Sequence, residues 1–217
     1  MKSITQTVEE FIERDHTPRE DGRYLSWDYC YGFFKNYFGR RDWEHGSLML
    51  AFYLASWGMY RGSSFLFQYT FTVHEKALQI IFSPKYDMLR FKRLLSSEDV
   101  PLLFELIRDL KEYYFEKNKQ IHSSIVSPNQ VSDTLISKIL LGVLGNIPAY
   151  DTYAKVGLKE LGLSQTMSEK GYLQLLKFYE DNKTEINVLS HTYKYPIMKI
   201  IDMYLWDLGF NLSFRVY

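Results

Sequence analysis

The sequence predicts an all-α fold, because helix start signals and apolar residues at helical spacing recur along the chain. The chain has 217 residues, of which 46% are hydrophobic and 24% are charged. These values are typical of a folded globular protein, and the length suits one large domain. We expect about nine helices in a single helical domain, residues 1–217, within which residues 1–117 and 131–217 would form two lobes.

Four of these helices are expected in the first half of the chain, each with a start signal or a break. The segment 43–60 is apolar on nearly all sides, which is typical of a central helix. The segment 65–82 mixes strand formers with a helical pattern, and we assign most of it to helix. The four helices begin with the Ser3–Gln6 capping box, run from Ser26 to about Phe38 and from Trp43 to Tyr60, and cover most of Phe65 to Phe82.

Five further helices are expected in the second half. Ser97 is a candidate N-cap for a helix from Glu98 to about Lys117, and the polar segment Asn118–Gln130 is the expected linker between the lobes. The remaining four begin at Ser132, at Asp151, at the Thr166–Glu169 capping box and at Pro196. The helix that begins at the capping box ends near Asn182, and Gly209 terminates the helix that begins at Pro196.

Composition excludes several classes of protein. The 26 basic and 26 acidic residues balance, whereas a dedicated nucleic-acid binder usually carries a basic excess. Cys30 is the single cysteine, so an intramolecular disulfide and a cysteine-built zinc site are excluded. The five histidines show no metal-ligand spacing, so we expect neither a metal nor a cofactor. The apolar stretch 48–59 is too short to span a bilayer, and the N-terminus has no signal region. We therefore expect a cytoplasmic protein with no membrane partner.

Aromatic residues make up 17% of the chain, including 18 tyrosines. Tyrosine combines an apolar ring with a polar tip, so it suits half-buried surfaces and grooves. Two interpretations follow: the chain binds a planar ligand, a nucleic acid or another protein, or it simply has an aromatic-rich core.

The turn Gly145-Asn146-Ile147-Pro148 follows a long apolar helix and brings Asp151 to the start of the next helix. Such a turn would hold a catalytic carboxylate rigidly. Asp is also among the most favoured N-cap residues, so Asp151 as a helix cap is the alternative.

The segment 148–156, Pro-Ala-Tyr-Asp-Thr-Tyr-Ala-Lys-Val, continues to Leu161-Gly162-Leu163. It resembles a segment of the helix-hairpin-helix DNA glycosylases, in which a Pro-containing turn leads to Val-Asp-Thr-His-Val and a helix that ends Arg-Leu-Gly. The resemblance covers about 25 residues. It implies a helical, two-lobed fold and a role for Asp151 opposite a flipped nucleotide, where it would stabilise an oxocarbenium-like sugar or activate the attacking nucleophile.

The chain also departs from that family's pattern. The phosphate-gripping Leu-Pro-Gly-Val-Gly hairpin is replaced by the segment 127–131, and Tyr153 stands where the family has His. The lyase-type Lys would fall near Asp133, and Lys138 is displaced from that position by a turn or more.

A second candidate site surrounds Arg61, which follows an apolar helix and lies between two glycines. Arg61 would pair with a phosphate or carboxylate, and the hydroxyls after it would donate to an anion. The alternative is a helix C-terminus with Gly62 as its terminator. The residues expected to line the substrate pocket or stack on a base are Arg61, Ser63, Ser64, Trp57, Tyr60 and Tyr153.

A third pattern places Lys199, Asp202 and Trp206 on one face of the last helix. The Lys–Asp pair either faces a cleft or forms a same-helix ion pair of little net energy beside a packed Trp.

The sequence thus predicts a DNA-glycosylase-like hydrolase that acts on a nucleotide base, with Asp151 as its acid and DNA as its partner. The alternative is a non-catalytic helical subunit of a bacterial defence or regulatory system, whose partner is another protein. Binding of a small molecule between two helical lobes is a third hypothesis.

Overall fold

The computed structural model describes residues 2–15, 22–37, 42–62, 64–121 and 131–214. These residues form helices and connecting turns without a β-strand, which confirms the all-α prediction. The α-helices within this part of the chain are α1 (Ile4–Asp15), α2 (Ser26–Tyr37), α3 (Trp43–Ser56), α4 (Glu75–Ile81), α5 (Val100–Ile121), α6 (Asp133–Val143), α7 (Thr152–Glu160), α8 (Glu169–Asp181), α9 (Lys183–Tyr193) and α10 (Ile197–Phe214).

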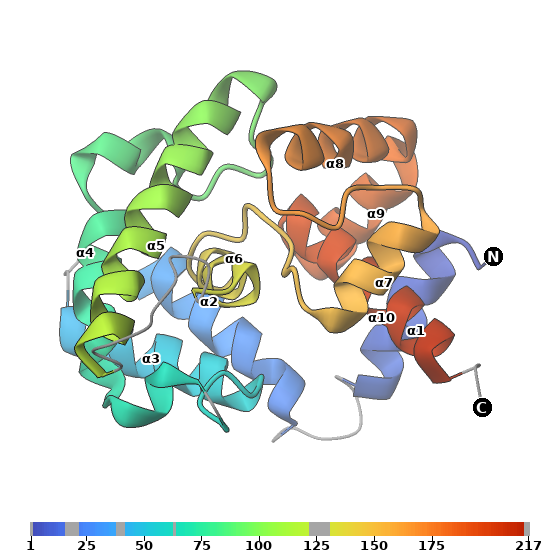
Figure 1. The fold of residues 1–217 in the computed structure, drawn as a ribbon. Helices are drawn as coiled ribbons and strands as arrows, with labels where there is room; N and C mark the ends of the chain where they lie inside the picture. The colour runs from blue at the N-terminus through green and yellow to red at the C-terminus, as the bar shows by residue number, and fades with distance from the viewer. Residues whose placement is uncertain (1, 16–21, 38–41, 63, 122–130, 215–217) are drawn as a thin grey trace.

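The helices form two groups that meet at α6 (Figure 1). Helices α2 to α5 lie on one side, and α7 to α10 lie on the other. Helix α1 packs against α9 and α10, so the start of the chain joins the C-terminal group rather than the residues that follow it. Of the expected linker 118–130, residues 118–121 continue α5, and residues 122–130 lie outside the described part of the chain.

Helix α6 is the central helix of the fold, and every residue from Leu135 to Val143 is buried. The sequence placed the segment 43–60 at the centre, but α3 ends at Ser56 and exposes half of Leu48 and Phe52. Apolar residues on nearly all sides of the segment 43–60 therefore did not identify the central helix. Helix α6, which holds the buried Lys138, is the more central of the two.

Helices α7 and α10 pack unusually closely through two glycines. A Cβ at Gly157 would lie 2.2 Å from the carbonyl oxygen of Leu205, and one at Gly209 would lie 1.9 Å from that of Tyr153. Gly209 was predicted to terminate the last helix, but α10 continues to Phe214. Its missing side chain serves the close approach of two backbones instead.

Several helix starts differ slightly from expectation. Ser132 caps α6 as predicted, and its hydroxyl accepts the backbone N–H of Leu135. Ser96, rather than Ser97, forms a capping box with Asp99 at the 3-10 helix Ser97–Asp99 that leads into α5. The hydroxyl of Ser168, rather than that of Thr166, caps α8 by accepting the N–H of Gly171. The segment 65–82 contains the 3-10 helices Phe65–Gln68 and Phe71–His74 followed by α4. Across the described residues, none of the helices has the length and apolar character that a membrane span requires.

Candidate functional site

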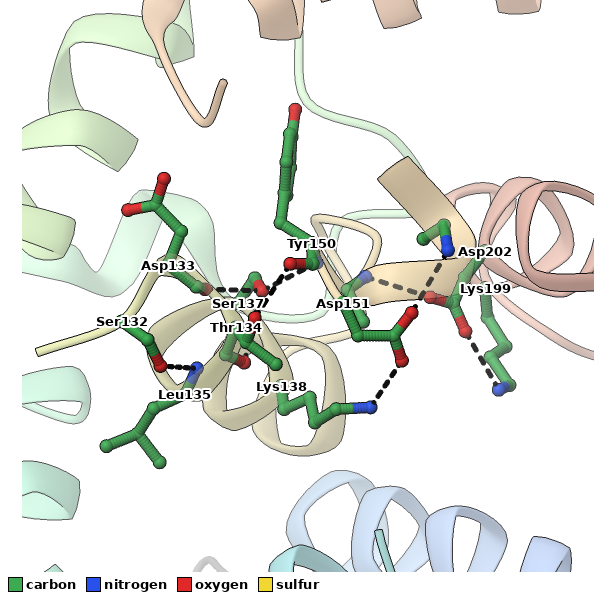
Figure 2. Close-up of polar contacts among 12 residues, drawn as sticks. Ser132, Asp133, Thr134, Leu135, Ser137, Lys138, Tyr150, Asp151, Lys199 and Asp202 are labelled. Atoms are coloured by element: carbon green, nitrogen blue, oxygen red, sulfur yellow. Dashed lines mark hydrogen bonds and ion pairs between the residues drawn. The ribbon is translucent and has the colours of Figure 1, made fainter. Parts of the chain in front are cut away.

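Asp151 lies at the turn between α6 and α7 and makes two kinds of contact at once. Its Oδ1 accepts the backbone N–H of Ala154 at 3.0 Å, so the residue is the N-cap of α7. Its Oδ2 receives Nζ of Lys138 at 2.9 Å, an ion pair that Figure 2 shows reaching across from α6. The Lys138 side chain is 5% exposed and that of Asp151 is 15% exposed, so the carboxylate forms the solvent-facing end of the pair.

The backbone that carries Asp151 is fixed from two helices. The N–H of Tyr150 donates to Ser137 Oγ at 2.9 Å, and its carbonyl accepts from Thr134 Oγ1 at 2.8 Å, both on α6 (Figure 2). The N–H of Ala149 donates to Oδ1 of Asp202 on α10 at 2.8 Å. Each bond satisfies a backbone group that the turn would otherwise bury unpaired. The carboxylate is therefore held on a rigid platform.

A second buried Lys–Asp pair lies beside the first. Nζ of Lys199 is 3.2 Å from Oδ2 of Asp202, and both side chains are at most one-tenth exposed. Each lysine also faces an indole: Nζ of Lys138 lies 4.7 Å from the ring centre of Trp57, and Nζ of Lys199 lies 4.9 Å from that of Trp27. These cation–π contacts supply part of the stabilisation that burial removes from an ammonium group.

The two pairs line one small cavity, together with the rings of Tyr53, Trp57 and Trp206. The cavity offers about 10 Å³, roughly the room that one water molecule needs. Burial, and then the charge of Asp202, raise the pKa of the Tyr53 hydroxyl well above its ordinary value, so it stays protonated beside the carboxylates. The Nε1–H of Trp57 is buried and has no hydrogen-bond partner within the described residues.

The structure brings some of the predicted site residues together and leaves others apart. Asp151 and Trp57 line the same cavity, and the ring of Tyr153 packs edge-on against Trp206 at 5.3 Å. Tyr60 lies elsewhere, with its hydroxyl 2.6 Å from Nε2 of the buried His74.

The segment around Arg61 does not line this cavity. The Arg61 side chain is exposed and lies against Gly58, whose left-handed backbone follows the end of α3. Ser64 precedes a short 3-10 helix without a side-chain cap, and Ser63 lies outside the described residues.

Lys138 is the functional candidate that sequence reasoning left outside the site. Its signal was available: it interrupts an apolar run in α6, with Ile136 and Ile139 close by. A lysine buried in such a helix needs an acidic partner, because burial of a lone ammonium group is costly. The sequence cannot identify that partner, since Asp151 is 13 positions away across a turn.

Within the described residues, no three His, Cys, Asp or Glu side chains gather as metal ligands. The groups that line the cavity are two carboxylates, two ammonium groups and aromatic rings, together with apolar side chains. Comparisons with family models, with curated proteins and with solved structures find no match for this chain.

Proposed function

We propose that this protein is a DNA-glycosylase-like hydrolase that cleaves the bond between a base and its sugar, with Asp151 as the catalytic carboxylate. The observation that carries the proposal is the Lys138–Asp151 pair at the edge of a one-water, aromatic-walled cavity. A structural cap needs only the bond to Ala154. A carboxylate that also holds a buried ammonium group and faces solvent is equipped to move protons.

The proposed reaction assigns a task to each member of the pair. As the bond between C1′ and the base nitrogen breaks, its electron pair leaves with the base, and the Asp151 carboxylate stabilises the positive charge on the sugar. The leaving base takes a proton from the Lys138 ammonium group through a bridging water molecule, because Lys138 lies behind Asp151. Water adds to C1′ and gives a proton to Asp151, which returns it to Lys138 across their 2.9 Å contact. The products are a free base and an abasic sugar.

The size of the cavity decides where the substrate would lie. Room for about one water suits the attacking water and not a nucleobase. The sugar would therefore approach the exposed edge of Asp151, while Lys138 stays behind it. The free indole N–H of Trp57 supplies a hydrogen-bond donor on the same cavity wall.

The test measures release of free base from DNA duplexes that carry uracil, hypoxanthine, oxidised or alkylated bases. We expect the wild type to excise at least one of them and Asp151→Asn to lose about 10²- to 10⁴-fold in rate, the usual contribution of an acid–base group. Asn caps a helix as well as Asp does, so the variant keeps the bond to Ala154. The matched control is Asp42→Asn, the same change at the N-cap of α3, where the side chain accepts from His45 N–H.

Two results would contradict the proposal. One is a wild type that neither excises any of these bases nor binds DNA at low salt. The other is an Asp151→Asn variant as active as Asp42→Asn. Borohydride treatment during turnover should trap no protein–DNA adduct, because hydrolysis passes through no Schiff base.

A second candidate function, a helical protein-interaction subunit, is favoured by a separate observation. Leu48 and Phe52 lie one turn apart on α3 and are each 49% exposed, and Tyr29 on the neighbouring α2 is 57% exposed. Two exposed large apolar side chains one turn apart on a helix, with a third on the neighbouring helix, are typical of interaction surfaces. A photo-crosslinking residue at Phe52, compared with one at the exposed Lys170, would capture one defined partner if this function holds.

A further inference from the structure

A groove of about 460 Å³ lies beside the described site and is built by three separate segments. Helix α2 contributes Tyr31 and Lys35, the segment before α5 contributes Phe91 and Arg93, and the chain from the end of α9 to Pro196 completes it. This volume is within the range of sites that hold ligands of nucleotide size.

The charges of the groove are all positive. Lys35, Arg93, His191 and Lys194 are exposed there, and none of the described residues that line it is acidic. The two lysines and Arg93 form no ion pair with a described carboxylate, although the chain as a whole is neutral and pairs many of its charges elsewhere. His191 and Lys194 are typical of a helix C-terminus. Lys35 and Arg93 come from other elements, so the helix end does not explain the cluster.

Aromatic rings interleave with these charges. Tyr31 and Tyr195 both pack on Trp27, the first stacked at 4.8 Å and the second edge-on at 5.4 Å. Their rings are fixed, and Phe91, from another segment of the chain, also lines the groove. Nζ of Lys35 lies 5.8 Å from the centre of the Tyr31 ring, and Arg93 donates to Oδ1 of Asn187 at 3.1 Å, so these cations have contacts but no acidic partner among the described residues. Fixed rings beside such cations are the combination that binds a base and its phosphate.

The backbone of the groove is also unusual. Phe91 has φ +48° and Lys194 has φ +57°, and these are the non-glycine residues with left-handed backbone among those described. Both line the groove. Residues other than glycine rarely adopt this conformation. At Lys194 it is the left-handed C-cap of α9, so Phe91 is the position that a helix end does not explain, and such residues cluster where a ligand must be held.

The groove and the cavity of Asp151 share structural support. Tyr31 stacks on Trp27, and the Trp27 ring also makes a cation–π contact with the ammonium group of Lys199. Lys199 in turn lines the cavity. Tyr31 and Pro196 also pack on Gly145, at the start of the turn that leads to Asp151: a Cβ there would lie 2.9 Å and 2.7 Å from them. The groove therefore rests on residues that also support the proposed catalytic pair.

We propose that this groove binds a nucleotide unit of a DNA strand, with the phosphate on Lys35, Arg93 and Lys194 and the base against the tyrosine rings. The choice of DNA as the source of the phosphate rests on the proposed function. The affinity of the groove for a phosphate-bearing nucleotide rests only on the charges and rings of the groove.

The test compares two triple variants by fluorescence polarisation with a labelled eight-nucleotide thymidine strand. Lys35→Gln/Arg93→Gln/Lys194→Asn removes the groove's charges; Asn tolerates left-handed backbone, so position 194 is not strained. The matched control, Lys76→Gln/Lys170→Gln/Lys177→Gln, removes the same charge from exposed, unpaired lysines on α4 and α8. Circular dichroism and thermal melting check that both variants fold.

We expect the control to bind like the wild type and the groove variant to bind about tenfold more weakly or worse at 50 mM salt. The slope of log affinity against log salt should fall by about 2, since each lost phosphate contact on a single strand removes about 0.7. Equal binding by the two triple variants would overturn the inference, and so would absence of binding by the wild type at 50 mM salt.

Competition by unlabelled thymidine monophosphate separates the two sources of phosphate. Displacement only by the oligonucleotide supports a DNA strand as ligand, and equal displacement by the mononucleotide overturns that choice while keeping the phosphate site. The Asp151→Asn variant should bind the strand like the wild type. If the wild type shows no excision activity but the groove variant still loses DNA binding, the proposed hydrolase is refuted and the inference about the groove stands.

Discussion

Replacement of Gly157 by alanine tests how closely α7 must pack against α10 to hold Asp151 in place. In an isolated helix this change stabilises by about 1 kcal/mol, because glycine is a poor helix former. Here the added Cβ would lie 2.2 Å from the carbonyl oxygen of Leu205 and 3.1 Å from its Cα. Since these are backbone atoms, no side-chain rotation relieves the contact, and the two helices must move apart by about 1 Å.

That movement affects the whole interface. Ala154 and Leu158 on α7 are fully or almost fully buried against it and would lose van der Waals contact. The 2.8 Å bond from Ala149 N–H to Asp202 crosses from the turn to α10 and would stretch. Overpacking a core costs about 1–3 kcal/mol, and a backbone clash lies at the upper end of that range. After subtraction of the helix-propensity gain, we expect Gly157→Ala to lower the free energy of unfolding by about 2 kcal/mol or more.

Urea denaturation followed by circular dichroism measures the effect as a lower midpoint at unchanged slope. The matched control is Gly32→Ala in α2, where an added Cβ meets no atom within 4 Å and the backbone is helical. It should raise stability by up to about 1 kcal/mol. The same substitution in two helices is thus expected to change stability in opposite directions. A Gly157→Ala variant as stable as the wild type would refute the close-packing argument.

Two further predictions concern buried charge. Burial lowers the pKa of His74 from 6.5 to about 3. Below pH 6.5 the unfolded chain therefore binds a proton that the folded chain excludes. The free energy of unfolding should be highest above pH 6.5 and should fall as the pH drops toward 3. Between pH 7 and 5 the loss should be about 2 kcal/mol, and His74→Gln, which does not titrate, should remove that part of the pH dependence in urea denaturation series. Lys138→Met leaves Asp151 without its cation and should destabilise by about 3 kcal/mol, whereas Lys138→Met/Asp151→Asn should recover part of that loss. If the losses of stability in Lys138→Met and Asp151→Asn add up to the loss in the double variant, the two residues are not coupled.

Local signals in the sequence predicted most of the helices, because capping residues and apolar spacing act within a few positions. The cap at Ser132 and the start of α10 after Pro196 follow from such signals. Gly209 shows the limit of this reasoning. A glycine near the end of an apolar helix is compatible with termination or with close packing, and only the position of Tyr153 across the interface decides between them.

The grouping of helices and the composition of the site depend on contacts that span the chain. No local pattern indicates that α1 packs on α9 and α10, because apolar stripes show which face is buried and not against what. For the same reason, the sequence could not predict which side chains surround Asp151. Sequence spacing placed Lys199 and Asp202 on one face of a helix, but their burial beside Lys138 depends on the fold, which brings residues of α6 and α10 to one cavity.

The four charges at the centre of the fold are difficult to explain by stability alone. A buried ion pair rarely stabilises a protein more than well-packed apolar residues of similar size would, since both ions lose their hydration. The pairs of Lys138 with Asp151 and of Lys199 with Asp202 occupy one cavity, where a core built only for stability would place leucine or methionine. The bond from Ala149 N–H gives Asp202 a structural task, and the bond from Ala154 N–H gives Asp151 one. Neither task requires a buried lysine, because a cap or a turn needs an acceptor only. Lys138 and Lys199 are thus the part of this cluster that folding does not account for, and the proposed reaction uses one of them: Lys138, as a proton donor held beside a carboxylate.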